Sequence, residues 1–160
     1  MTIQIRDTCI FKKEKYDIIS SEEDFDFIPE DYGIIPQFKA TFCWRGYWCN
    51  YYIKKNGIFL NKLTVNCENQ IYPPLNGVNI SNSTYCGHKI YKNVNLPIKY
   101  TGSLIIGKDV VLKGYANTGY IKASNYATLL KLVFKDGILV NVIDKRNSWI
   151  NRLRKLILRG

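Results

Sequence analysis

Short apolar runs rich in aromatic and β-branched residues, separated by turn-forming residues, make up most of this chain. Two of the turns are Asn56-Gly57 and Asp136-Gly137, and each stands between two apolar runs. Both central residues of a type I′ turn need a positive φ, which these dipeptides tolerate, and this turn matches the twist of paired strands. The pattern therefore predicts β-hairpins over residues 52–60 and 133–140.

Other runs extend the prediction to a series of strands. Thr8–Phe11 and Lys15–Ile19 flank a charged turn and predict a third hairpin. Gly46 interrupts an aromatic-rich run, where we expect a bulge or a tight turn. Ser20–Glu30 reads as an acidic loop. The remaining strands are expected at Phe38–Trp44, Tyr47–Lys54, Ile90–Val94, Ile98–Ile106 and Val110–Gly114.

The C-terminal residues follow a helical period instead. Ser148 has the side chain of a helix N-cap. The apolar residues after it fall on one helical stripe, which consists of Trp149, Ile150, Leu153, Leu156 and Ile157. We therefore expect residues 145–160 to form a basic, amphipathic helical tail.

Length and composition set the fold class. The chain has 160 residues and no Pro- or Gly/Ser-rich linker, so we expect a single β-rich domain over residues 1–160, ending in the helical tail. Twelve tyrosines suit half-buried sheet faces, because the ring can be buried while the hydroxyl stays in water. The prediction is an all-β fold, a mainly antiparallel sandwich or partly open barrel, with one C-terminal amphipathic helix.

The charge of the chain is unevenly distributed. Residues 1–40 hold five Lys/Arg against nine Asp/Glu, whereas residues 41–160 hold eighteen against four. Such asymmetry is typical of proteins that meet a charged partner, such as nucleic acid, an anionic membrane surface or an acidic protein. The alternative is a compositional bias that serves only solubility.

The cysteines and the single histidine limit the chemistry. Five cysteines stand at irregular spacings without a Cys-x-x-Cys pair, and His88 is the one histidine, so we expect no metal site and no cofactor. The first residues lack the apolar segment of a signal peptide, and no apolar run is long enough to span a membrane. Reduced thiols in a cytoplasmic protein are the simplest interpretation.

The densest candidate binding segment is 41–52, where arginine lies among aromatic residues. As a binding surface, its aromatic side chains would stack on bases or anchor a partner protein, and its arginine would meet phosphate or carboxylate. The candidate residues are Trp44, Arg45, Tyr47 and Trp48. The alternative is structural, because alternate residues of a strand point to opposite faces and half of them then belong to the core.

The same segment carries a resemblance to a known family. Thr41–Tyr47 matches a T-x-C-x-R-G-Y strand motif, and Ile58–Leu60 follows the Asn-Gly turn as a return strand. Tyr100–Gly107 resembles a later G-x-L-x-I-x-x-G element, and Leu130–Leu139 a final hairpin. In these features the chain resembles a family of small uncharacterised bacterial proteins without an established function. The resemblance spans roughly residues 7–143 and implies the fold and a bacterial origin; Phe59 stands where tyrosine is usual.

The basic residues of the tail form a second candidate surface. Arg152, Arg154 and Lys155 lie off the apolar stripe. They suit phosphate contacts in nucleic acid, or weak contact with a membrane surface through the neighbouring apolar residues. The alternative is a helix that covers the end of the sheet and leaves its basic face in water.

These observations favour a non-enzymatic bacterial binding protein that engages a protein partner, with immunity-type neutralisation of a toxin as one concrete form. One alternative is a nucleic-acid-binding module that uses the basic surface and the C-terminal helix. Another is a hydrolase or nuclease built on His88, which has little support because a lone loop histidine is more often a surface residue. We name no catalytic residue, and the oligomeric state stays open.

Overall fold

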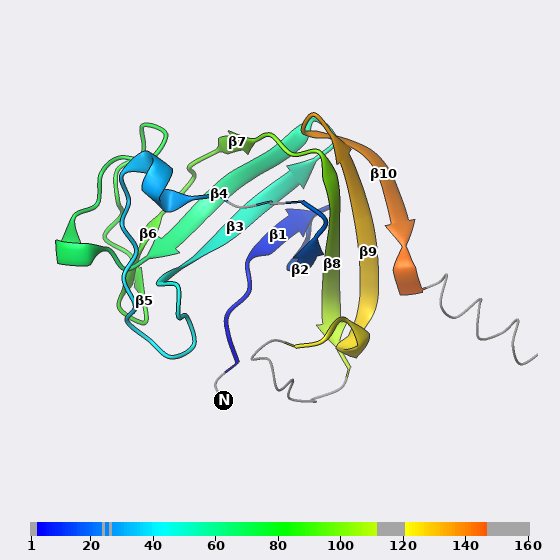
Figure 1. The fold of residues 1–160 in the computed structure, drawn as a ribbon, viewed down its shortest axis with the longest axis horizontal. Helices are drawn as coiled ribbons and strands as arrows, with labels where there is room; N and C mark the ends of the chain where they lie inside the picture. The colour runs from blue at the N-terminus through cyan, green and yellow to red at the C-terminus, as the bar shows by residue number, and fades with distance from the viewer. Residues whose placement is uncertain (1–2, 24, 26, 112–120, 147–160) are drawn as a thin grey trace, which may run out of the picture.

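The described residues form one curved sheet (Figure 1). The computed structural model describes residues 3–23, 25, 27–111 and 121–146. The strands of this part are β1 (Thr8–Phe11), β2 (Glu14–Ser21), β3 (Tyr47–Lys54), β4 (Gly57–Val65), β5 (Thr84–Tyr85), β6 (His88–Tyr91), β7 (Leu96–Ile98), β8 (Gly102–Val110), β9 (Tyr126–Lys135) and β10 (Ile138–Asp144). Three short 3-10 helices join them: η1 (Pro29–Tyr32), η2 (Glu68–Gln70) and η3 (Ala123–Asn125). The all-β class is thus confirmed.

The three predicted hairpins are confirmed. β9 and β10 turn at Asp136-Gly137, as predicted, with φ values of 51° and 82°. β3 and β4 also form a hairpin, but Lys54 pairs with Gly57, so its turn residues are Lys55-Asn56, one position before the predicted Asn56-Gly57. In the first hairpin, β1 and β2 join at Lys12-Lys13, whose φ values are 48° and 66°. Positive φ at two successive residues is the geometry of a type I′ turn, so two lysines take the turn positions that Asn-Gly or Asp-Gly usually fills.

The sheet is mixed rather than purely antiparallel. Its strand order is β10-β9-β8-β2-β1-β3-β4-β6-β5, and β7 pairs separately with β4. Every pairing is antiparallel except that of β1 with β3, where Thr8 is opposite Asn50. This parallel pair lies at the middle of the sheet and joins the hairpin β1–β2 to the hairpin β3–β4. The expectation of a mainly antiparallel sheet holds with this one exception.

Curvature brings distant parts of the sheet together without closing it. The backbone N–H of Leu139, at the start of β10, donates to the carbonyl of Lys55 in the β3–β4 turn, with an N···O distance of 3.1 Å. Gly137 similarly donates to Tyr100 at 2.9 Å. β10 otherwise ends the strand order, so its outer edge carries no further strand among the described residues.

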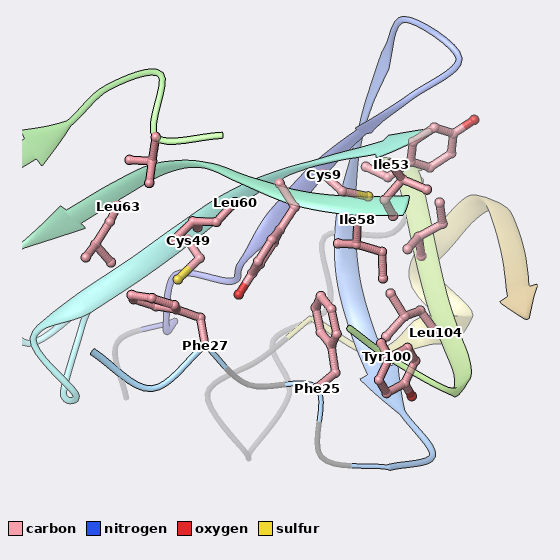
Figure 2. Packing of buried hydrophobic residues seen from close by; sticks show 14 of the residues in the cluster. Cys9, Phe25, Phe27, Cys49, Ile53, Ile58, Leu60, Leu63, Tyr100 and Leu104 are labelled. Carbon is pink, nitrogen blue, oxygen red and sulfur yellow. The ribbon is translucent and has the colours of Figure 1, made fainter. Parts of the chain in front are cut away.

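The core lies on the concave side of β3 and β4 (Figure 2). Leu60 and Leu63 of β4 are fully buried, and Leu104 of β8 faces them across the fold. Phe25 and Phe27 enter this core from the acidic segment after β2. The segment predicted as an acidic loop therefore supplies two core aromatics.

The predicted strand Phe38–Trp44 is wrong. The segment forms turns, with the N–H of Cys43 bonded to the carbonyl of Ala40 at 3.0 Å. The amide of Gln4 donates to Thr41 and accepts from the N–H of Trp44. Because a side chain takes up these backbone groups, they are not available to a neighbouring strand.

Two predictions concern residues that the structure describes only in part. Of the strand expected at Val110–Gly114, Val110 is the last residue of β8 and Val111 lies outside any strand, while residues 112–120 lie outside the described residues. Most of the helical tail, residues 147–160, also lies outside them and stays a prediction. Within the described part, no helix is long and apolar enough to cross a membrane.

Candidate functional site

Arg45 of the aromatic segment has structural partners. Its guanidinium lies 4.3 Å from the centroid of the Tyr47 ring and donates to the Tyr47 carbonyl at 2.9 Å. It also forms an ion pair with Asp7, whose carboxylate accepts the backbone N–H of Cys49 at 2.8 Å. Burial opposes the charge of Arg45, but the negative charge of Asp7 outweighs it, so the pKa of Arg45 lies above its usual value. Arg45 thus fastens the chain before β1 to β3.

The other predicted residues of the segment do not share one surface. Trp48 is 6% exposed and packs its ring against His88, with the ring centroids 5.1 Å apart. Tyr47 is half-buried beneath Arg45. Trp44 is 55% exposed. Trp44 is therefore the one exposed aromatic among the four candidate residues, while Trp48 belongs to the core. Arg45 is exposed, although it is paired with Asp7.

The basic residues predicted in the tail, Arg152, Arg154 and Lys155, lie outside the described residues. Their role as a nucleic-acid or membrane-surface contact stays a prediction.

His88 is fully buried and lies in an aromatic cluster with Trp48 and Phe42. Its Nδ1 lies 3.2 Å from the carbonyl of Cys86, and its Nε2 has no hydrogen-bond partner among the described residues. A general base must come within hydrogen-bond reach of its substrate, so this placement gives no support to a hydrolase built on His88. Burial lowers the pKa of the imidazole, which favours its neutral form.

The buried His88 predicts a pH dependence of stability. A depressed folded-state pKa means that the unfolded chain takes up the proton first, so stability is complete above the unfolded pKa and falls as the pH drops below it. We expect the urea midpoint to be lower at about pH 5.5 than at about pH 7.5, since an unperturbed histidine titrates near 6.5. His88→Gln is expected to remove most of this difference, because His88 is the one histidine of the chain. An unchanged difference in the variant would assign the effect to other groups.

An open groove of about 730 Å³ lies where three parts of the chain meet. It is lined by four consecutive residues from each: Ile10–Lys13 at the β1–β2 turn, Tyr52–Lys55 at the β3–β4 turn, and Leu139–Val142 in β10. Most of the lining is apolar, and Tyr52, Val140 and Val142 are exposed there. A groove of this size and lining has the properties of a binding site.

Four lysines line the same groove. They are Lys12, Lys13, Lys54 and Lys55, and all four are exposed. Lys12 lies over the ring of Phe11 and Lys54 over the ring of Phe59, with Nζ 5.5 and 5.4 Å from the ring centroids. Within the described part of the chain none of the four forms an ion pair, and no lining residue is acidic. The groove therefore joins an apolar surface to a concentrated, uncompensated positive charge.

We call this surface the lysine groove; it consists of residues 10–13, 52–55 and 139–142. The sequence analysis did not predict it. A signal was present, because Lys-Lys pairs stand at the turns of two predicted hairpins. The pattern does not say that these turns meet, since their proximity depends on the parallel pairing of β1 with β3. The contribution of β10 depends on the curvature of the whole sheet.

No cluster of three or more potential metal ligands occurs among the residues that the structure describes. Comparison with protein families, with curated proteins and with solved structures finds no match to this chain. The likeness to the bacterial family thus rests on the motif residues alone, and the groove is interpreted from its own chemistry.

Proposed function

We propose that this chain is a non-enzymatic binding protein that engages a protein partner through the lysine groove. The observation that carries the proposal is the groove itself, in which exposed apolar side chains lie beside four lysines without acidic partners. Protein interfaces combine an apolar centre with a polar rim, and charge complementarity steers the partner to it. Immunity-type neutralisation of a toxin remains one form that this function can take.

The composition of the groove supports binding rather than catalysis. Its described lining has no carboxylate, imidazole or thiol, and Tyr52 carries its one side-chain hydroxyl. Carboxylate, imidazole and thiol side chains are the groups that most general acid–base and nucleophilic mechanisms employ. The five free cysteines favour a reducing compartment such as the cytoplasm as the place where the protein acts.

The described residues support binding of nucleic acid less well than binding of a protein partner. Arg45 is already paired with Asp7, and Trp48 is buried. Single-stranded nucleic acid is usually bound by a row of exposed aromatic side chains along a positive channel, whereas the exposed part of the lysine groove offers Tyr52 together with aliphatic valines. Nuclease treatment of a lysate therefore separates a nucleic-acid partner from a protein partner.

The test is a comparative capture from a bacterial lysate. The immobilised protein is expected to retain a protein partner after nuclease treatment, and Lys13→Glu/Lys55→Glu is expected to lose it by charge repulsion. The matched control is Lys92→Glu/Lys122→Glu, which changes two exposed lysines outside the groove and is expected to retain the partner. Equal capture by both variants, or capture that disappears with nuclease, would overturn the proposal.

A further inference from the structure

The outer edge of β10 lies in the wall of the lysine groove. Successive side chains of a strand point to opposite faces, so a surface lined by the four consecutive residues Leu139–Val142 includes the edge of the strand as well as one face. The opposite edge of β10 is occupied by β9. An open strand edge presents backbone N–H and C=O groups that a further strand can pair with.

The sequence of β10 lacks the usual protection of an edge strand. Ile138–Ile143 contains neither lysine nor proline, and Ile138, Val140, Val142 and Ile143 are all exposed. One irregularity is present, a register shift between Leu139 and Asn141 that leaves Val140 out of the pairing with β9. A strand docking on this edge would therefore pair mainly beyond the shift.

The hydrogen bond of Val142 indicates where such pairing would occur. Its backbone N–H donates to the side-chain oxygen of Asn141, with an N···O distance of 2.9 Å. The local side chain thus serves as acceptor for this strand N–H. The carbonyl of a docking strand can replace this amide oxygen at little cost, because one hydrogen bond is exchanged for another.

Charge selects the occupant. A second copy of this chain would bring a net charge of +10 and its own four groove lysines to the interface. Residues 147–160 of the chain itself carry four basic residues and no acidic ones. By net charge both occupants are unfavourable, whereas an acidic segment of a partner protein neutralises the groove.

We propose that the lysine groove binds an acidic, extended segment of a partner protein, which adds as a strand to the outer edge of β10. This rests on the proposed function and specifies its mode. Main-chain hydrogen bonds to β10 supply affinity, the apolar lining takes alternate side chains of the segment, and the lysines select for carboxylates.

The test uses a fluorescent seven-residue peptide that alternates valine with glutamate, and a counterpart that alternates valine with lysine. Fluorescence anisotropy is expected to show binding of the glutamate peptide at least about tenfold tighter than that of the lysine peptide. Added salt is expected to weaken binding of the glutamate peptide. Lys13→Glu/Lys55→Glu is expected to abolish or reverse the preference. Equal binding of both peptides, or none of the glutamate peptide, overturns the inference.

A second comparison separates strand addition from simple adhesion. Val142→Pro removes the edge N–H, and Val142→Ala removes most of the side chain but keeps the N–H. We expect Val142→Pro to lose peptide binding and Val142→Ala to retain most of it. Because the proline variant can fail to fold, wild-type protein is also tested with a backbone N-methylated glutamate peptide, which is expected not to bind.

The other outcomes of these experiments distinguish strand addition from other ways of filling the groove. Undiminished binding of the N-methylated peptide overturns strand addition. So does a groove that binds laurate or a single-stranded oligonucleotide but not the glutamate peptide. Partner capture that depends on Lys13 and Lys55 without peptide binding would leave the proposed function standing and this mode refuted. Binding of the glutamate peptide without any captured partner would support strand addition at the groove and count against the proposed function.

Discussion

Gly46→Ala is expected to lower the free energy of unfolding by about 3 kcal/mol, because it combines backbone strain with a steric clash. Gly46 has a φ of +82°, in the left-handed region that residues with a Cβ avoid. An added Cβ would lie 2.5 Å from the carbonyl oxygen of Gln37. That oxygen belongs to backbone, which is held in place by the Gln37 N–H bonded to Asn66 at 2.7 Å. The clash therefore cannot be relieved by turning a side chain.

Gly77→Ala is the matched control for this prediction. Gly77 has a nearly equal φ of +74°, and nothing lies within 4 Å of the position a Cβ would take. Its loss should be about 1 kcal/mol, the strain of the left-handed conformation alone. Urea unfolding of the two variants measures both values. Similar losses would mean that the segment around Gln37 moves away from Gly46 without cost.

Sequence reasoning succeeded where the determinants of structure are local. Asp136-Gly137 between apolar runs predicts the turn of its hairpin correctly, and Asn56-Gly57 predicts the β3–β4 hairpin with its turn one residue too late; each hairpin is formed by neighbours in sequence. Phe38–Trp44 has the composition of a strand, but Gln4 binds its backbone from 37 to 40 residues away. A pattern within the segment does not reveal a partner at that separation.

The same limit applies to the site. Arg45 was recognised as the unusual residue of its segment, but its pairing with Asp7 requires the chain before β1 to lie beside β3. The lysine groove is further from local prediction, because it combines the turns of two hairpins in the middle of the sheet order with β10 at one end of that order. Each of its parts is ordinary in sequence, and only their convergence makes a charged apolar surface.

Phe25→Ala is expected to destabilise the protein by about 3–4 kcal/mol, the usual cost of truncating a buried phenylalanine. Phe25 is 6% exposed although it lies in a segment without regular structure. Its ring centroid lies 5.0 Å from that of Tyr51 in β3. It lies 5.2 Å from that of Tyr100, just before β8, and Figure 2 shows Phe25 beside Tyr100. Truncation therefore leaves a cavity between the two halves of the curved sheet.

Two variants make this prediction specific. Phe25→Leu keeps most of the buried volume and is expected to lose about 1 kcal/mol. Phe38→Ala truncates an aromatic that is 56% exposed in another irregular segment, and is expected to change stability by less than about 0.5 kcal/mol. Urea unfolding followed by tyrosine and tryptophan fluorescence measures all three. A loss for Phe25→Ala no larger than that for Phe25→Leu would mean that the acidic segment opens separately from the sheet. A large loss would show that this segment, with Glu22 and Glu23 beside Phe25, is held against the core as part of one cooperative unit.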